Sequence, residues 1–136
     1  MVALLIRAVA IDELAEIWPK VRDPLDRLYR KVKSDGWIPE DVYALCASNA
    51  ATLYVNEGVW IGFMVLQIIP RYTKRSLHVW LLHVERAPEE FMGELRELAK
   101  AHGCEKITFR SPRRGWERRA QDLGFKAVST NYEQGV

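Results

Sequence analysis

Residues 76–103, SLHVWLLHVERAPEEFMGELRELAKAHG, contain the strongest signals for a strand followed by a helix. The first part of this stretch, Ser76 to Glu85, is rich in Leu, Val and Trp, and this composition predicts a strand. Ala87-Pro88-Glu89-Glu90 then combines a proline with two acids, as is typical of the first turn of a helix. We expect that helix to reach about His102, because Gly103 is a common helix stop.

The residues before this stretch predict helices and then strands. Asp12 is a suitable N-cap for a first helix, which Pro19 should end or kink because proline lacks an amide and clashes with the preceding turn. Asp23-Pro24 begins a second helix, and Gly36 stops it. The other expected elements are a strand at 2–9, a helix from Pro39 to Ser48-Asn49, and strands at 52–55 and 59–69.

The residues after the stretch complete a single α+β unit. They predict a strand at 105–109, a helix at 113–123 that Gly124 stops, and a last strand from Phe125 to Tyr132. No repeat, linker or low-complexity tract interrupts the chain. We therefore expect one domain over residues 1–136.

Composition excludes several classes of protein. Hydrophobic residues make up 49% and charged residues 28% of the 136 residues, which is typical of a globular chain. The net charge of +2 does not indicate a nucleic-acid binder. The longest apolar run, 59–69, is too short to span a bilayer, and no signal peptide is apparent, so we expect a cytoplasmic protein. Cys46 and Cys104 form neither a disulfide framework nor a metal motif.

The element order resembles that of the GNAT acetyltransferases. The best local match is Ala120-Gln121-Asp122-Leu123-Gly124-Phe125, which resembles the GNAT helix that finishes with a Gly-Phe pair. Ile38 to Tyr43, Ala101 to Cys104, Arg113 to Trp116 and Asn131 to Glu133 are similar to a group of small GNAT-like proteins encoded by tailed phages and prophages. The resemblance implies a GNAT-like α+β fold, with a mixed, mostly antiparallel central sheet flanked by helices.

The loop that binds acetyl-coenzyme A phosphates in GNAT enzymes has no counterpart here. Its glycines let backbone amides approach the pyrophosphate at a helix N-terminus. The matching stretch, Glu85 to Gly93, has no paired glycines, and Pro88 removes one donor. Glu89 and Glu90 add charge of the wrong sign, at an expected cost of a few kcal/mol, on the order of the Coulomb energy in a partly desolvated site. Arg86 is the residue that still suits a phosphate.

The general acid and the general base of GNAT chemistry are also in question. Many GNAT enzymes have a Tyr where Ala120 stands, to protonate the leaving thiolate. His83 or Glu85, at the end of the central strand, is a candidate base for the attacking amine. Alternatively, His83 is a hydrogen-bonded sheet residue and Glu85 ends the strand. His78 and His83 are expected on opposite faces, because side chains alternate along a strand.

Basic residues cluster near the C-terminus, and two interpretations of them stay open. One is a phosphate or nucleic-acid surface, and the other is a solvated helix face with Glu117 and Asp122 as local partners. We favour the solvated face, because the net charge is small and no nucleic-acid motif is present. The cluster consists of Arg110, Arg113, Arg114, Arg118 and Arg119.

The C-terminal strand is expected to lie at an open edge of the sheet. A complete GNAT sheet has one more strand than this chain provides after Tyr132. Exposed edges invite pairing with another chain. We therefore expect a protein partner or self-association at this edge.

Two functions are weighed most closely. The first is a non-catalytic binding or virion-associated protein of phage or prophage origin with no cofactor, which the missing loop and Ala120 favour. The alternative is a divergent N-acetyltransferase that uses acetyl-CoA, with Arg86 toward the phosphates and Glu85 or His83 as base. A nucleic-acid module that uses the arginine cluster is a third, less favoured, hypothesis.

Overall fold

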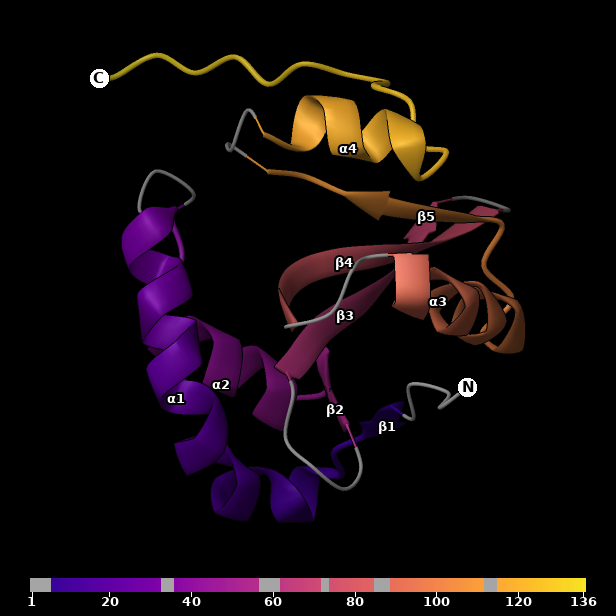
Figure 1. Ribbon diagram of the computed structural model, residues 1–136. Helices are drawn as coiled ribbons and strands as arrows, with labels where there is room; N and C mark the ends of the chain where they lie inside the picture. Colours follow the sequence, from indigo (N-terminus) through magenta and orange to yellow (C-terminus); the bar gives the residue numbers. More distant parts are fainter. Residues whose placement is uncertain (1–5, 33–35, 57–61, 72–73, 85–88, 112–114) are drawn as a thin grey trace.

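Five strands form one sheet in the order β1-β2-β3-β4-β5 (Figure 1). The computed structural model describes residues 6–32, 36–56, 62–71, 74–84, 89–111 and 115–136. Strands β1 to β4 are antiparallel, and β5 is parallel to β4, which confirms the mixed, mostly antiparallel sheet. The strands are β1 (Ile6–Ala8), β2 (Thr52–Asn56), β3 (Gly62–Arg71), β4 (Lys74–Val84) and β5 (Lys106–Phe109). The helices are η1 (Ile11–Glu13), α1 (Leu14–Lys31), α2 (Pro39–Ala47), α3 (Glu89–Ala101) and α4 (Trp116–Asp122).

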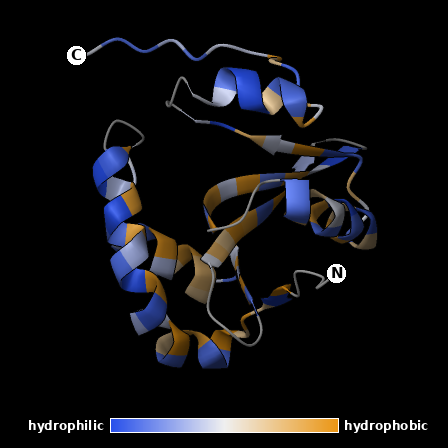
Figure 2. Ribbon diagram, in the orientation of Figure 1, coloured by the Kyte–Doolittle hydropathy of each residue, from blue (hydrophilic) through white to orange (hydrophobic). Residues whose placement is uncertain are grey.

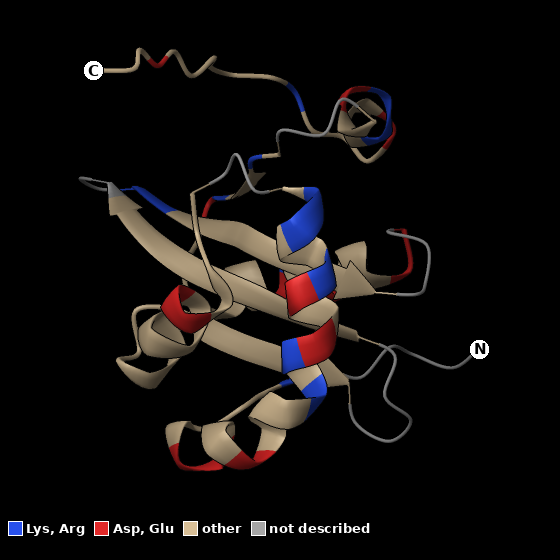
Figure 3. Cartoon of the chain, turned by 90° about the vertical axis from the view of Figure 1, so that its left-hand side faces the viewer, with Lys and Arg blue, Asp and Glu red and all other residues tan. Residues whose placement is uncertain are grey.

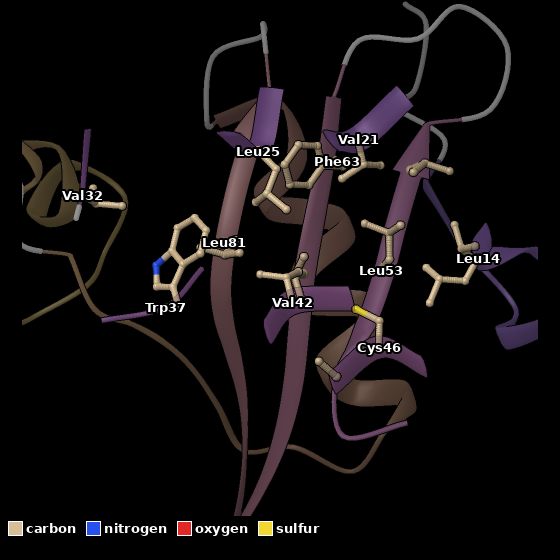
Figure 4. Close-up of a cluster of buried hydrophobic side chains, with 14 residues drawn as sticks. Leu14, Val21, Leu25, Val32, Trp37, Val42, Cys46, Leu53, Phe63 and Leu81 are labelled. Atoms are coloured by element: carbon tan, nitrogen blue, oxygen red, sulfur yellow. The ribbon is translucent and has the colours of Figure 1, made fainter. Parts of the chain in front are cut away.

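The sheet is covered on both faces, so it has two hydrophobic cores (Figures 1 and 2). One core lies between the sheet and helices α1 and α2, where Val21, Leu25 and Phe63 are almost fully buried (Figure 4). The other lies against α3, where Phe91 packs with Met64 of the central strand. Since successive side chains of β3 enter opposite cores, its continuous apolar sequence is explained.

Helix α1 corrects the expectation of two helices separated at Pro19. The structure has one helix over Leu14–Lys31, with Pro19 and Pro24 both inside it. An internal proline costs about 3 kcal/mol or more, whereas each buried side chain contributes about 1.5–3 kcal/mol. Val21 and Leu25, between and after the prolines, are 0% exposed. Packing of this face on the sheet outweighs the local helix-breaking signal.

Helix α2 begins where the sequence predicted. Pro39 occupies the first helical position, and the Asp41 carboxylate accepts a hydrogen bond of 3.0 Å from the backbone amide of Ile38. Glu40 pairs with Arg22 of α1 at 2.7 Å, which joins the two helices at their exposed sides. No helix among the described residues is long and apolar enough to cross a membrane.

The C-terminal segment is not the strand that the sequence predicted. Helix α4 ends at Asp122 and Gly124 follows in a left-handed conformation (φ 89°), which confirms the predicted stop. Residues 125–136 then pair with no described strand, and in Figure 1 the yellow trace turns back past α4, on the side away from β5. Val128 and Tyr132 are 78% and 91% exposed. The sequence has strand propensity there, but a strand needs a neighbour to supply its hydrogen bonds.

The close approach of β3 to β4 at Gly62 yields a stability test. A Cβ added there would collide with the carbonyl of His83 and the backbone of Val84. Gly62→Ala should therefore lower the free energy of unfolding by about 1–3 kcal/mol, as overpacking does. Gly93→Ala, in the middle of α3 and facing open space, should instead raise it by about 0.5–1 kcal/mol through helix propensity. Urea denaturation of both variants measures the two effects, and equal shifts would contradict the packing described.

Candidate functional site: a cleft between strands β4 and β5

Strand β4 is fully paired on one side and only half paired on the other. Its residues from Lys74 to Val84 pair with β3. On the opposite edge, only Ser76 to Val79 pair with Lys106 to Phe109 of β5. From Trp80 to Val84, therefore, this edge has no strand partner among the described residues. Its backbone N–H and C=O groups face the space where the two strands diverge.

A β-bulge lies where the divergence begins. Leu66 pairs with Val79 and Val65 pairs with Leu81, so Trp80 is the extra residue of β4. Such a bulge leaves the added residue out of the ladder and re-aims the side chains beyond it. Trp80 and Leu81 both pack in the α1 and α2 core, with Trp80 against the ring of Trp37 at 6.4 Å.

The bulge makes one expectation about the histidines wrong. His78 and His83 were predicted on opposite faces from simple alternation. His83 stacks on Phe63 of the α1 and α2 core, with ring centroids 5.6 Å apart. His78 lies on the same face, since its neighbours Leu77 and Val79 belong to the α3 core and the bulge reverses the alternation after Val79. The five intervening steps still separate the two rings by on the order of 15 Å.

A cleft occupies the divergence between the two strands, with a cavity volume of about 120 Å³. It is bounded by residues of both hydrophobic cores, so it passes between β4 and β5 from one face of the sheet toward the other. Its lining is mostly apolar and aromatic. The lining residues are Leu28, Val32, Val79, Trp80, Leu81, Leu82, Phe91, Met92, Leu95, Phe109, Arg110, Ser111, Trp116, Leu123 and Phe125.

Aromatic rings build the β5 side of this cleft. Phe109 is the last residue of β5, and its ring meets Trp116 of α4 at 5.4 Å and Phe125 at 4.9 Å, both edge to face. The Arg119 guanidinium lies over the Trp116 ring, 5.4 Å from its centroid. These contacts position α4 beside β5. The Gly-Phe pair of the sequence thus supplies a wall of the cleft, through Phe125.

The predicted basic cluster is brought together only in part. Arg110 follows β5 and lines the cleft, while Arg119 lies over Trp116 on its aromatic wall. Arg118 is exposed on α4, and Arg113 and Arg114 lie outside the described residues. Charges of both signs are interspersed along the helices in Figure 3.

The remaining predicted site residues flank the end of β4. His83 is half-buried on β4 beyond the pairing with β5, and it is not among the residues that line the cleft. Glu85 and Arg86 lie outside the described residues, so their candidate roles as base and phosphate ligand stay predictions. Glu89 and Glu90 are exposed in the first turn of α3. Because solvent screens exposed charges, they oppose a nearby anion less than a desolvated pair would.

His78 does not line the cleft, and its side chain instead contacts the neighbouring strand β5. Its Nδ1 lies 2.9 Å from the hydroxyl oxygen of Thr108 on β5, and the two residues are paired in the sheet. Burial, and then the positive charge of Arg110, lower the pKa of His78 below its ordinary value. The neutral imidazole therefore links β4 to β5 just before the strands separate.

Several solved structures to which the chain is similar are acetyltransferases. A probable acetyltransferase has a TM-score of 0.68 at 13% identity, with 98% of each chain covered. The ribosomal-protein-alanine N-acetyltransferase of Brucella melitensis biovar Abortus 2308 has a TM-score of 0.69 at 17% identity, with 99% of this chain and 100% of that chain covered. An aminoglycoside acetyltransferase from an uncultured soil metagenomic sample has a TM-score of 0.65 at 16% identity, with 97% of each covered.

Comparisons by sequence add no further likeness. No family model matches the chain, and no curated protein does. At identities below 20%, the structural similarity establishes the fold and leaves the activity open. The sequence did not predict the bulge at Trp80 or the role of Phe109. A bulge does not change the residue types of an apolar run, so the sequence contains no signal for it.

The depressed pKa of His78 predicts a pH dependence of stability. The folded imidazole takes up its proton at lower pH than the unfolded one, so the unfolded chain binds more protons below about pH 6.5. The free energy of unfolding should therefore fall as the pH drops from 7 to 5. In His78→Gln, which keeps a polar partner for Thr108, the fall should be shallower. Urea denaturation at several pH values measures both slopes, and parallel curves would contradict the assignment.

The chain folds as a GNAT-like α+β domain whose sheet opens between β4 and β5.

Proposed function

We propose that the chain is an acyl-CoA-dependent N-acyltransferase that transfers an acetyl group to an amine. The observation that carries the proposal is the cleft, in which Trp80 to Leu82, beyond the pairing of β4 with β5, face an apolar wall. The acetyltransferases among the structural neighbours agree with it. They agree less with the non-catalytic role that the missing phosphate loop favoured, and neither the phage setting nor the virion role has support in the fold or the comparisons.

The cleft suits the pantetheine arm of coenzyme A. That arm is a thin, extended chain in which two amides alternate with methylene groups. Amides of the arm can pair with backbone groups of β4 beyond Val79, on the edge that no described strand covers, as an added strand would. The methylene groups fit the apolar lining, for which Leu82 and Met92 are examples. The bound arm would take the place that β5 leaves vacant beside β4.

The passage between the two faces of the sheet separates the two substrates. The cleft has Leu28 and Trp80 on the α1 and α2 face, and Phe91 and Leu95 on the α3 face. A thioester that enters from one face can meet an amine that arrives from the other. We place the contact point at the bulge, where a backbone N–H on the cleft side would donate to the thioester oxygen as it becomes negative.

The reaction needs one base and one proton for the leaving group. The amine nitrogen attacks the thioester carbon, the C–N bond forms, the C–S bond breaks, and CoA leaves as a thiolate. His83 is on β4 three residues beyond the bulge and next to Leu82 of the cleft lining, and we assign it to accept the proton of the amine. Ala120 cannot donate a proton, so the thiolate would be protonated by water.

Binding of acetyl-CoA is the first test. At 100 times the dissociation constant, acetyl-CoA should add about 2.7 kcal/mol to the free energy of unfolding. Ser111→Trp should abolish this gain, because it fills the cleft at the end of β5. Ser48→Trp, at the exposed end of α2, is the matched control and should keep it. The proposal fails if 1 mM acetyl-CoA leaves the denaturation curve of the unmodified chain unchanged.

The base assignment has its own test. His83→Gln should lower kcat/KM for an amine acceptor by about 10²- to 10⁴-fold and leave the affinity for acetyl-CoA unchanged. His102→Gln, at an exposed site after α3, is the control and should retain full activity. Release of the CoA thiol measures both rates. Equal rates in the two variants would remove His83 from the mechanism and leave Glu85 as the remaining candidate.

A further inference from the structure

A second cavity lies on the α1 and α2 side of the sheet, and it shares one residue with the cleft. Its volume is about 380 Å³. Trp80, the extra residue of the bulge, belongs to the lining of this cavity and to that of the cleft. A molecule bound at the bulge can therefore extend into it. The residues that line this Trp37 cavity are Gly36, Trp37, Asp41, Ala44, Leu45 and Trp80.

Two indole rings give the Trp37 cavity its aromatic walls. The rings of Trp37 and Trp80 meet edge to face with their centroids 6.4 Å apart, and Trp37 also packs against Tyr29 at 5.7 Å. These contacts hold both rings in place. The indole N–H of Trp37 is buried and has no hydrogen-bond partner among the described residues, so the protein alone does not satisfy this ring. The face of an indole is the aromatic surface that attracts a cation most strongly.

Asp41 supplies a negative charge beside these rings. Its Oδ2 accepts the hydrogen bond of 3.0 Å from the Ile38 amide, which fixes the position of the carboxylate at the start of α2. Its Oδ1 makes no hydrogen bond or ion pair with the described residues. Arg22, the cation that reaches this turn from α1, is already paired with Glu40 at 2.7 Å. A fixed carboxylate oxygen next to two indole rings is a suitable site for an ammonium group.

We propose that the Trp37 cavity binds an ammonium group, and that the amine acceptor is therefore a diamine or polyamine. One nitrogen of the acceptor, in its neutral form, attacks the thioester at the bulge. A second nitrogen keeps its proton, lies against Trp37 and Trp80 and pairs with Asp41. The identity of the acceptor rests on the proposed acyl transfer, whereas the binding of the ammonium group does not.

A titration with 1,4-diaminobutane, followed in the indole N–H region of the NMR spectrum, tests the ammonium site without turnover. The signals of Trp37 and Trp80 should shift, because the charge binds against their rings. The signal of Trp116, on the β5 side of the cleft, should stay where it is. Single Trp→Phe variants assign the three signals. Unchanged signals of Trp37 and Trp80 at about 10 mM diamine, a very weak affinity, would overturn the site.

The charge of Asp41 is tested with a neighbouring acid as the control. Asp41→Asn keeps an oxygen for the Ile38 amide and removes the charge, so it should weaken binding of the diamine by about tenfold. Glu40→Gln removes the same charge one residue earlier, outside the lining, and should weaken binding much less. The loss of its exposed pair with Arg22 should have little effect on the fold. Equal weakening by the two variants would contradict the role of Asp41.

The choice of acceptor is tested by release of the CoA thiol with 1,4-diaminobutane and with butylamine, which has the same carbon chain and one nitrogen. The diamine should have a kcat/KM higher by about tenfold or more. Ala44→Phe fills the cavity from an exposed position of α2 and should remove this preference. Ala47→Phe, also exposed but outside the lining, should keep it.

The outcomes separate this inference from the proposed function. Equal kcat/KM for the two amines in the unmodified chain would overturn the diamine as acceptor and leave acyl transfer intact. Absence of thiol release with either amine would contradict the acyl transfer, and the diamine as its acceptor with it. The shifts of Trp37 and Trp80 then decide whether the cavity binds an ammonium group.

Discussion

The structure depends on how β4 is paired. On one side β4 pairs with β3 from Lys74 to Val84 except at Trp80, and on the other side only Ser76 to Val79 pair with β5. Beyond Val79, strand β4 therefore depends on β3 for its place in the sheet. The burial of Phe63 and Val65 stabilises β3 there. A stable β3 and β4 pair is what permits β5 to diverge without unravelling the domain.

The bulge at Trp80 helps to form the cleft between the diverging strands β4 and β5. It reverses the side-chain alternation, so Trp80 and Leu81 fill the α1 and α2 core while Leu82 returns to the α3 face. As a result the same strand contributes to both cores and to the cleft between them. Aromatic contacts from Phe109 then fix the opposite wall. The result is a narrow apolar passage with one polar backbone edge.

The sequence predicted the elements well where local signals and packing agree. Helix α2 begins at Pro39, α3 runs from Glu89 to Ala101, and Gly124 follows α4, as the capping residues indicated. The sequence predictions were wrong where contacts between residues far apart in the sequence determine the structure. Pro19 lies within a continuous helix because the sheet packs against its buried face, and the segment after Phe125 is no strand because no described strand pairs with it. The cleft was not predictable either, since a bulge depends on register between strands and not on residue type.

We propose that the edge of β4 beyond its pairing with β5 is a binding surface for an extended amide-containing ligand. Amide-resolved hydrogen exchange by NMR, with and without coenzyme A, tests it most directly. We expect coenzyme A to slow exchange at alternate amides between Trp80 and Val84, those on the β5 side, and to leave those bonded to β3 unchanged. Saturating coenzyme A that leaves exchange across this stretch unaltered would contradict it.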